Sequence, residues 1–128
     1  KKSKILIRKY KASKGKEFFI SIEDTKNNVL FGFCRLRFPS QELKKEITKN
    51  SAIIRELHVY SKALALGKHS KESYQHRGLG KKLVKKAEEI ALENNKNKMI
   101  IISGIGVKEY YIKKLEYKKD GPYVSKLL

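Results

Sequence analysis

The chain has little of what several classes of protein require. Its single cysteine, Cys34, permits no intrachain disulfide and no cysteine-ligated metal or iron–sulfur site, and we expect no metal. No apolar run reaches membrane-spanning length, and the first residues lack the pattern of a secretion signal. Cysteine usage fits a reducing compartment, so we expect a cytoplasmic protein that makes no membrane contact.

Acidic residues are also scarce. Against 31 lysines and arginines stand only 13 aspartates and glutamates, giving a net charge of +18. Lysine-rich surfaces can serve solubility or heat resistance, but glutamate then usually rises with lysine, and here it does not. We therefore predict a polyanionic partner, nucleic acid first, with a generic basic surface as the alternative.

The pattern of apolar residues predicts one α/β domain spanning residues 1–128. Apolar and polar residues alternate along the first half, and 98–103 is a continuous apolar run typical of a strand buried on both faces. We expect a mixed central sheet flanked by helices. The expected strands are 4–10, 17–23, 29–38, 51–60, 98–103 and a closing pair within 116–128; the expected helices are a short one within 40–50, a central one and 107–115, and 61–74 is expected to be a loop or lid.

The most informative stretch is Tyr74–Leu83, which contains Gly78 and Gly80 among basic residues. An amphipathic helix follows directly, with an apolar face formed by Leu79, Leu83, Val84, Ala87, Ile90 and Ala91. We expect the glycines to lie in the first helical turn, where backbone N–H groups lack intrahelical acceptors and the helix dipole favours anions. This junction is therefore predicted to bind a phosphate or pyrophosphate.

Other titratable residues have two interpretations each. Glu56 and His58 lie two residues apart on an expected strand, so their side chains point the same way about 7 Å apart, either as chemical groups or as a solvated strand face. Ile53, Leu57 and Val59 are expected on the other face of that strand. Cys34 is interpreted as a small core residue rather than a nucleophile, since no histidine is near it in sequence.

Two common nucleotide motifs are excluded by residues that are absent. The dinucleotide fingerprint needs a third glycine where Leu83 stands, and no Gly-Lys-Ser or Gly-Lys-Thr occurs for a phosphate loop. What remains, Gln75-x-x-Gly78-x-Gly80 between a strand and a long helix, resembles the pyrophosphate signature of GNAT-type N-acetyltransferases. The resemblance implies the GNAT-type acyltransferase fold and acetyl-CoA as cofactor.

Further motifs in the same order resemble the acetyltransferase domain of the Elongator catalytic subunit. They are Leu36–Ser40, Arg55–Tyr60, Gln75–Gly80, Ile102–Val107, Tyr110-Tyr111 and Asp120–Tyr123, which together span nearly the whole chain. Members of that family carboxymethylate the wobble uridine of tRNA, joining this domain to an upstream radical-SAM domain that holds an iron–sulfur cluster and S-adenosylmethionine. The resemblance thus implies the C-terminal part of a larger protein, with tRNA, acetyl-CoA and the upstream domain as partners.

The resemblance also implies roles for residues at the matching positions. Backbone groups from His76 to Lys81 would hold the pyrophosphate, with Arg77 and Lys82 adding charge unless they are ordinary surface residues. Tyr110 or Tyr111 would lie near the thioester, and Glu56 or His58 would orient water or polarise the acetyl group. The expected catalytic residues are Tyr110, Tyr111, Glu56 and His58. The expected cofactor contacts are Glu56, Leu57, His58, Val59, Gln75, His76, Arg77, Gly78, Leu79, Gly80, Lys81, Lys82, Tyr110 and Tyr111.

Three departures from the family pattern affect the surroundings of the expected site. Glu116 stands where the family usually has glycine, Ser61 replaces another common glycine, and the lid segment is short. Three functional hypotheses follow from the sequence as a whole. The first is an Elongator-type acetyl-CoA domain, the second a free-standing acetyltransferase acting on an amine, and the third a basic tRNA-binding module without a working cofactor site.

Overall fold

The computed structural model describes residues 4–12, 15–39, 50–60, 71–102 and 115–128, and at residues 10, 12 and 71–77 it describes the backbone only. One seven-stranded sheet runs through this part of the chain in the order β1-β2-β3-β4-β5-β7-β6. The strands are β1 (Lys4–Ala12), β2 (Gly15–Asp24), β3 (Val29–Pro39), β4 (Ser51–Val59), β5 (Lys98–Ile101), β6 (Lys118–Asp120) and β7 (Tyr123–Leu127). The helix is α1 (Lys71–Glu93).

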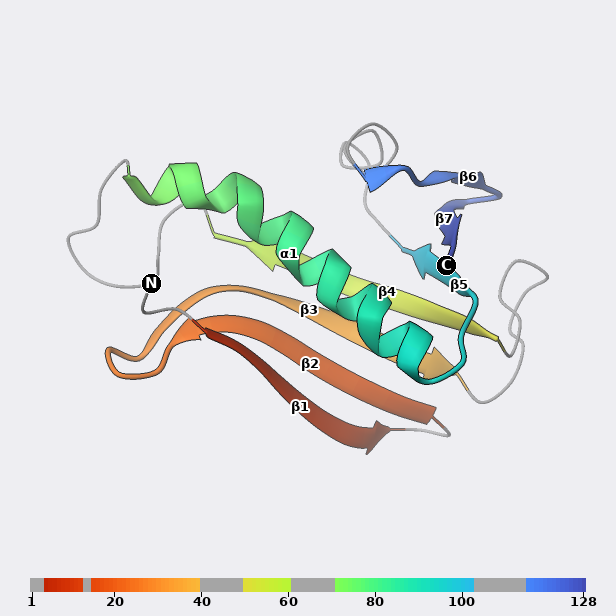
Figure 1. Ribbon diagram of the computed structural model, residues 1–128, viewed down its shortest axis with the longest axis horizontal. Helices are drawn as coiled ribbons and strands as arrows, with labels where there is room; N and C mark the ends of the chain where they lie inside the picture. The colour runs from red at the N-terminus through yellow and green to blue at the C-terminus, as the bar shows by residue number, and fades with distance from the viewer. Residues whose placement is uncertain (1–3, 13–14, 40–49, 61–70, 103–114) are drawn as a thin grey trace.

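The strand pairing is antiparallel except between β4 and β5, which are parallel. A parallel pair needs a crossover connection, and α1 lies in it. α1 runs across one face of the sheet and packs against β2, β3 and β4 (Figure 1). The expected strands and the mixed sheet are confirmed. The helices expected within 40–50 and at 107–115 fall on residues of which only 50 and 115 are described.

The core forms where the apolar stripe of α1 meets the inner face of the sheet. The helix contributes the six residues expected from its periodicity, all buried: Leu79, Leu83, Val84, Ala87, Ile90 and Ala91. β2 contributes Phe18, Ile20 and Ile22, which confirms the alternation read from the sequence. Cys34 is fully buried, and burial raises the pKa of its thiol to about 12, so it is a core residue and not a nucleophile.

The opposite face of the sheet holds a buried carboxylate that the sequence pattern did not reveal. Glu17 on β2 is only 3 % exposed. Three guanidinium groups surround its carboxylate: the Nη1 atoms of Arg37 and Arg55 lie 3.0 and 3.3 Å from Oε2, and Nη2 of Arg35 lies 3.4 Å from Oε1. The cluster joins β2, β3 and β4 and compensates the burial of one charge with three of opposite sign.

A smaller polar cluster joins β5, β6 and β7. Lys98 Nζ lies 2.8 Å from Asp120 Oδ2, and the Ser125 hydroxyl donates a hydrogen bond to the same oxygen at 2.8 Å. The hydrogen bonds from Lys98 and Ser125 hold the pKa of the Asp120 carboxyl below its ordinary value. The cluster fastens the closing hairpin, which turns at Gly121, to the centre of the sheet.

This cluster predicts a pH-dependent contribution to stability. Because folding lowers the pKa of Asp120, its contribution is present above the ordinary aspartate pKa and is lost as the pH falls through the lowered value. Asp120→Asn should therefore cost about 1 kcal/mol of unfolding free energy at neutral pH and much less near ~pH 2. Urea unfolding at the two pH values measures this. An equal cost at both would show that the carboxylate charge contributes nothing.

Candidate functional site

β4 and β5 diverge beside the residues expected to hold the cofactor. A bulge interrupts the pairing of β3 with β4: Arg35 pairs with Glu56 and Leu36 with Ile54, so Arg55 is an extra residue. Bulges bend a strand and increase its twist. On β4, the pairing with β5 covers only Ser51–Ile54. A 3.1 Å hydrogen bond from the Ile102 N–H to the Ile54 carbonyl extends it by one residue on the β5 side. Beyond that point Glu56–Val59 pairs with β3, and no strand among the described residues pairs with the other edge of this segment.

Glu56 and His58 share one face of β4, as predicted. Both are exposed, and they lie on the sheet face away from α1, because they pair with Arg35 and Phe33 rather than with the core residues of β3. Glu56 Oε1 lies 3.4 Å from Arg35 Nη1, and the His58 ring centroid lies 5.1 Å from that of Phe33. They therefore face away from the glycine stretch on α1.

Leu57 and Val59 occupy the inner face and pack partly against the main core. Ile53 does not share that face, contrary to the strict alternation expected from the sequence. It belongs to a second small cluster with Ile100 and Tyr123. The reason is the extra residue Arg55, which reverses the alternation between the two halves of the strand.

α1 begins earlier than the sequence predicted. Its first residue is Lys71, so Gly78 and Gly80 are the eighth and tenth helical residues rather than part of the first turn. The expected loop therefore ends before Lys71, and the expected free N–H groups at 76–81 lie within the helix. The segment 71–77 contains no proline or glycine, and each glycine beyond it costs about 1 kcal/mol relative to alanine, which a long packed helix tolerates.

The glycines differ in their surroundings. Gly78 is exposed, and a Cβ atom added to it would meet nothing within 4 Å. Gly80 is buried, and Leu79 between them points into the core. Lys81 and Lys82 follow on the surface. The stretch therefore combines an open backbone position with two adjacent cations, which fits an approaching phosphate group. The backbone of 75–77 is helical.

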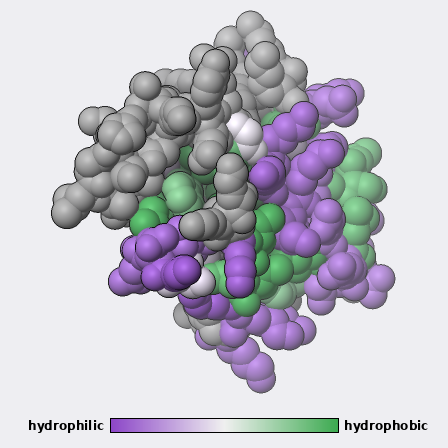
Figure 2. Space-filling model, turned by 60° about the vertical axis from the view of Figure 1, so that its left-hand side comes forward, coloured by the Kyte–Doolittle hydropathy of each residue, from purple (hydrophilic) through white to green (hydrophobic). Residues whose placement is uncertain are grey.

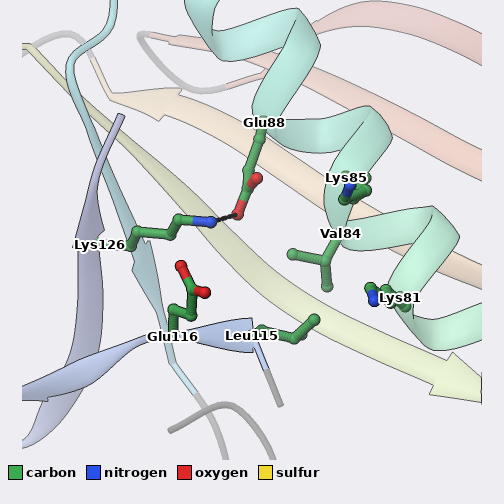
Figure 3. A pocket seen from close by; sticks show the side chains of 7 residues that line it. All are labelled: Lys81, Val84, Lys85, Glu88, Leu115, Glu116 and Lys126. Carbon is green, nitrogen blue, oxygen red and sulfur yellow. Dashed lines mark hydrogen bonds and ion pairs between the residues drawn. The ribbon is translucent and has the colours of Figure 1, made fainter. Parts of the chain in front are cut away.

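A cavity of about 210 Å³ lies next to Lys81, between α1 and the closing strands. Figure 3 shows its lining residues, which come from both sides: Lys81, Val84, Lys85, Glu88, Leu115, Glu116 and Lys126. Lys81 links this cavity to the glycine stretch. Five lining residues carry formal charge, three positive and two negative. The cavity is therefore polar, and its charges are closer to balance than those of the whole chain.

Glu88 fixes the geometry of this cavity. Its Oε2 accepts a 2.7 Å hydrogen bond from the Tyr117 hydroxyl, and Lys126 Nζ lies 3.5 Å from the same oxygen (Figure 3). Sequence periodicity placed Glu88 on the exposed helix face, but its side chain is only 14 % exposed. The partners lie 29 and 38 residues further along the chain, so helical spacing alone could not identify them.

Glu116 adopts a backbone conformation that side chains disfavour. Its φ is 67°, in the left-handed region where glycine is preferred. This accounts physically for the glycine expected at this position in the related family.

The left-handed φ makes a stability prediction. Glu116→Gly should raise the unfolding free energy by about 1 kcal/mol, because glycine adopts this φ without steric cost. Thermal or urea unfolding measures the change. Asn95→Gly is the matched comparison, since Asn95 has a φ of 65° but asparagine tolerates that region, so a smaller gain is expected there. A loss of stability in Glu116→Gly would show that its side-chain contacts outweigh the strain.

Several expected site residues cannot be placed. Tyr110 and Tyr111 lie outside the described residues, as do the lid residues before Lys71, and the side chains of Gln75, His76 and Arg77 are not described. Within the described ranges, no group of three or more histidine, cysteine, aspartate or glutamate side chains is arranged to hold a metal ion. The one described helix is not apolar enough to cross a membrane.

The fold and the sequence together define the class of protein. Residues 2–115 match the family described as "Acetyltransferase (GNAT) family". The chain belongs to this family. Its mixed sheet with α1 in the β4–β5 crossover is the GNAT fold, as the sequence predicted.

Within this family, the chain is similar in sequence to proteins named for tRNA modification and for the Elongator complex. The chain is 46 % identical over 127 residues to the tRNA uridine(34) acetyltransferase of Methanocaldococcus jannaschii, which covers 98 % of the chain and 23 % of the relative. It is 43 % identical over 126 residues to Elongator complex protein 3 of Saccharomyces cerevisiae, covering 95 % of the chain and 22 % of the relative. The chain therefore spans about a quarter of the length of these curated relatives.

Solved structures agree with this placement. The structure of archaeal Methanocaldococcus infernus Elp3 with residues 1–46 deleted matches with a TM-score of 0.87 and 46 % identity, over 99 % of this chain and 30 % of that chain. The PaiA N-acetyltransferase of Thermoplasma acidophilum, solved in complex with coenzyme A, matches with a TM-score of 0.56 and 18 % identity, over 88 % of this chain and 61 % of that chain. The second likeness concerns the fold alone.

Proposed function

We propose that this chain is the acetyl-CoA-binding domain of an enzyme that modifies the wobble uridine of tRNA. The observation that carries the proposal is the stretch Gln75–Lys82 on α1, next to the divergence of β4 from β5, in a chain 46 % identical to a protein named tRNA uridine(34) acetyltransferase. The charge of +18 supports a polyanionic substrate.

The residues present fit a coenzyme A molecule. Gly78 leaves open space beside the helix backbone, and Lys81 and Lys82 supply positive charge for a pyrophosphate. The edge of Arg55–Val59 with which no described strand pairs offers backbone donors and acceptors to an extended amide chain, as an adjacent strand would. When bound, the cofactor supplies a thioester whose acetyl group can be transferred.

Phosphate binding by backbone groups would require a shorter helix. In the full helix, the N–H groups of 76–81 point to carbonyls one turn earlier. Unwinding 71–77 would release them and make the glycines the first turn, as the sequence pattern suggested. The two glycines weaken this end of the helix by about 2 kcal/mol in total relative to alanine, which favours such a change. We propose that cofactor binding starts α1 at the glycines.

The residues expected to act in catalysis would do so where β4 and β5 diverge beyond Ile54, here called the β4–β5 opening. An acceptor that reaches the opening from the face opposite α1 would meet Glu56 and His58, which are exposed there. Either could orient a water molecule or hold a proton. Tyr110 or Tyr111 would serve as the proton donor to the departing thiolate. These roles follow from the family resemblance and the placement of β4.

The relatives are about four times as long as this chain, which supports a multidomain enzyme. We propose that radical-SAM chemistry, with an iron–sulfur cluster and S-adenosylmethionine, belongs to an upstream domain, and that the enzyme binds RNA in the cytoplasm. An alternative is a free-standing acetyltransferase acting on an amine. It is favoured by the solved acetyltransferases that share the fold, of which the chain covers 61 % and 73 %.

Calorimetry and turnover assays distinguish these functions. The 128-residue chain should bind a non-hydrolysable acetyl-CoA analogue, and tRNA should change the rate of acetyl-CoA consumption. Acetylation of amines without any effect of tRNA would favour the free-standing enzyme. Absence of analogue binding would reject both enzymes and leave a basic RNA-binding module.

A further inference from the structure

A second cavity lies at the other end of α1 from the glycines. It has a volume of about 410 Å³ and is lined by Lys11, Gly15, Lys16, Phe38, Pro39, Asn94 and Lys96. The ends of β1 and β3, the start of β2 and the C-terminal end of α1 meet here (Figure 1). Asn94, the residue after α1, is 16 positions beyond Gly78, a distance of about 24 Å at about 1.5 Å per residue. The cavity is therefore distinct from the proposed acetyl-CoA site.

Among the described residues that line this cavity, all the charges have one sign: three are lysines and none is acidic. Lys11 and Lys16 are direct partners in the β1–β2 register, on the side of the sheet that α1 covers. Like charges directly opposite each other in an antiparallel pair are destabilising. An arrangement that costs stability when empty is expected where an anion binds between the two charges.

The third lysine is held in place by the end of the helix. The Lys96 N–H donates a 2.9 Å hydrogen bond to the Ala91 carbonyl, and the Asn95 N–H donates one to Leu92 at 3.1 Å, with Asn95 at a φ of 65°. This is the Schellman arrangement that ends many helices. Lys96 Nζ then lies 5.2 Å from the centroid of the buried Phe38 ring. The helix end thus fixes the backbone at Lys96, and the ammonium group lies against the Phe38 ring.

We propose that this cavity binds the phosphodiester backbone of RNA. The inference rests on the proposed function, which makes tRNA a partner, and it adds a contact about 24 Å from the acetyl-CoA site. Lysines act as point charges that neutralise phosphates without reading bases. A concave site with three lysines, one each from β1, β2 and the turn after α1, fits a projecting sugar–phosphate ridge better than a flat lipid surface. The net charge of +18 also suits a polyanion such as RNA. Figure 2, which faces the other end of the molecule, shows that hydrophilic side chains cover much of the described surface there as well.

Two triple variants with the same loss of charge test the proposal. Lys11→Gln/Lys16→Gln/Lys96→Gln removes the cavity lysines. Lys26→Gln/Lys118→Gln/Lys119→Gln removes exposed lysines from the β2–β3 turn and from β6. Affinity for a fluorescent tRNA transcript is measured across a salt series. The slope of log K against log salt should fall by about two in the cavity variant, which corresponds to about a 100-fold loss at 0.1 M salt. The control slope should change by less than about one.

Several results would overturn the proposal. They are equal losses in both variants, an unchanged slope in the cavity variant, or displacement of tRNA by polyglutamate at equal charge concentration. Stability supplies a second measurement, since Lys16→Gln should raise Tm by relieving repulsion from Lys11. Acetyl-CoA analogue binding is followed in the same proteins. If the native chain binds the analogue but does not bind tRNA, this inference and the proposed action on tRNA are rejected, whereas the proposed cofactor site is not.

Discussion

Gly78→Ala is expected to leave the domain folded and to weaken binding of acetyl-CoA by at least tenfold. A methyl group at position 78 meets nothing within 4 Å in the structure, and alanine favours the helix over glycine by about 1 kcal/mol. Stability should therefore stay equal or rise. Binding should fall for two reasons: the Cβ occupies the space where a phosphate would approach, and the stronger helix resists the proposed unwinding.

Paired measurements separate these effects. Isothermal titration with the acetyl-CoA analogue gives the affinity, and thermal unfolding gives the stability. Glu93→Ala is the matched control, because Glu93 is an exposed residue in the last turn of the same helix, far from the glycines. Its affinity should equal that of the native chain. If Gly78→Ala gains stability and keeps full affinity, the phosphate does not approach this position.

Glu17→Gln is expected to have the largest effect on stability, about 3 kcal/mol. The neutral amide leaves the guanidinium groups of Arg35, Arg37 and Arg55 close together without the buried anion that now separates their charges. Arg37 is the least exposed of the three, at 15 %, so its lost partner costs most. Partial solvation of the other two limits the loss.

Urea unfolding with a matched variant tests this expectation. Glu56→Gln also removes a carboxylate beside Arg35, but Glu56 is 45 % exposed, and Arg35 is its one ion-pair partner among the described side chains, at 3.4 Å. Its loss should cost at most about 0.5 kcal/mol. Similar costs in the two variants would show that burial and the three-fold charge environment do not matter at position 17.

Much of the fold follows from patterns local to the sequence. Alternation along Glu17–Glu23 and the apolar run 98–103 are physical requirements of half-buried and fully buried strands, and both strands form. The stripe on α1 likewise predicts which helix face is buried. These features depend on the spacing of neighbours along the chain, so the sequence alone reveals them.

Features that depend on pairing between strands could not be predicted in the same way. The extra residue Arg55 reverses the face of Ile53 relative to Leu57, and nothing in the local alternation marks it. Burial of Glu17 depends on the strand register, which brings Arg35 and Arg37 of β3 and Arg55 of β4 beside it. A charged residue in an alternating strand is by default expected to be solvated.

The start of α1 could not be predicted for a different reason. Glycine spacing predicted a helix beginning at Gly78, whereas the backbone is helical from Lys71. Helix propensity decides this boundary by small free-energy differences, about 1 kcal/mol for each glycine, and a bound ligand can outweigh them. The family signature and the observed helix are thus reconciled if the cofactor shortens α1.

The central claim is that coenzyme A binds at the glycine stretch, and amide chemical shifts test it most directly. A chain labelled with ¹³C and ¹⁵N is titrated with the acetyl-CoA analogue, and the shifts of each backbone N–H and carbon are followed. The largest changes should fall on His76 to Lys81, with smaller ones along Arg55–Val59, and 71–77 should lose its helical carbon shifts. Saturable binding with the largest changes elsewhere, and none at Gly78 or Gly80, would contradict the claim.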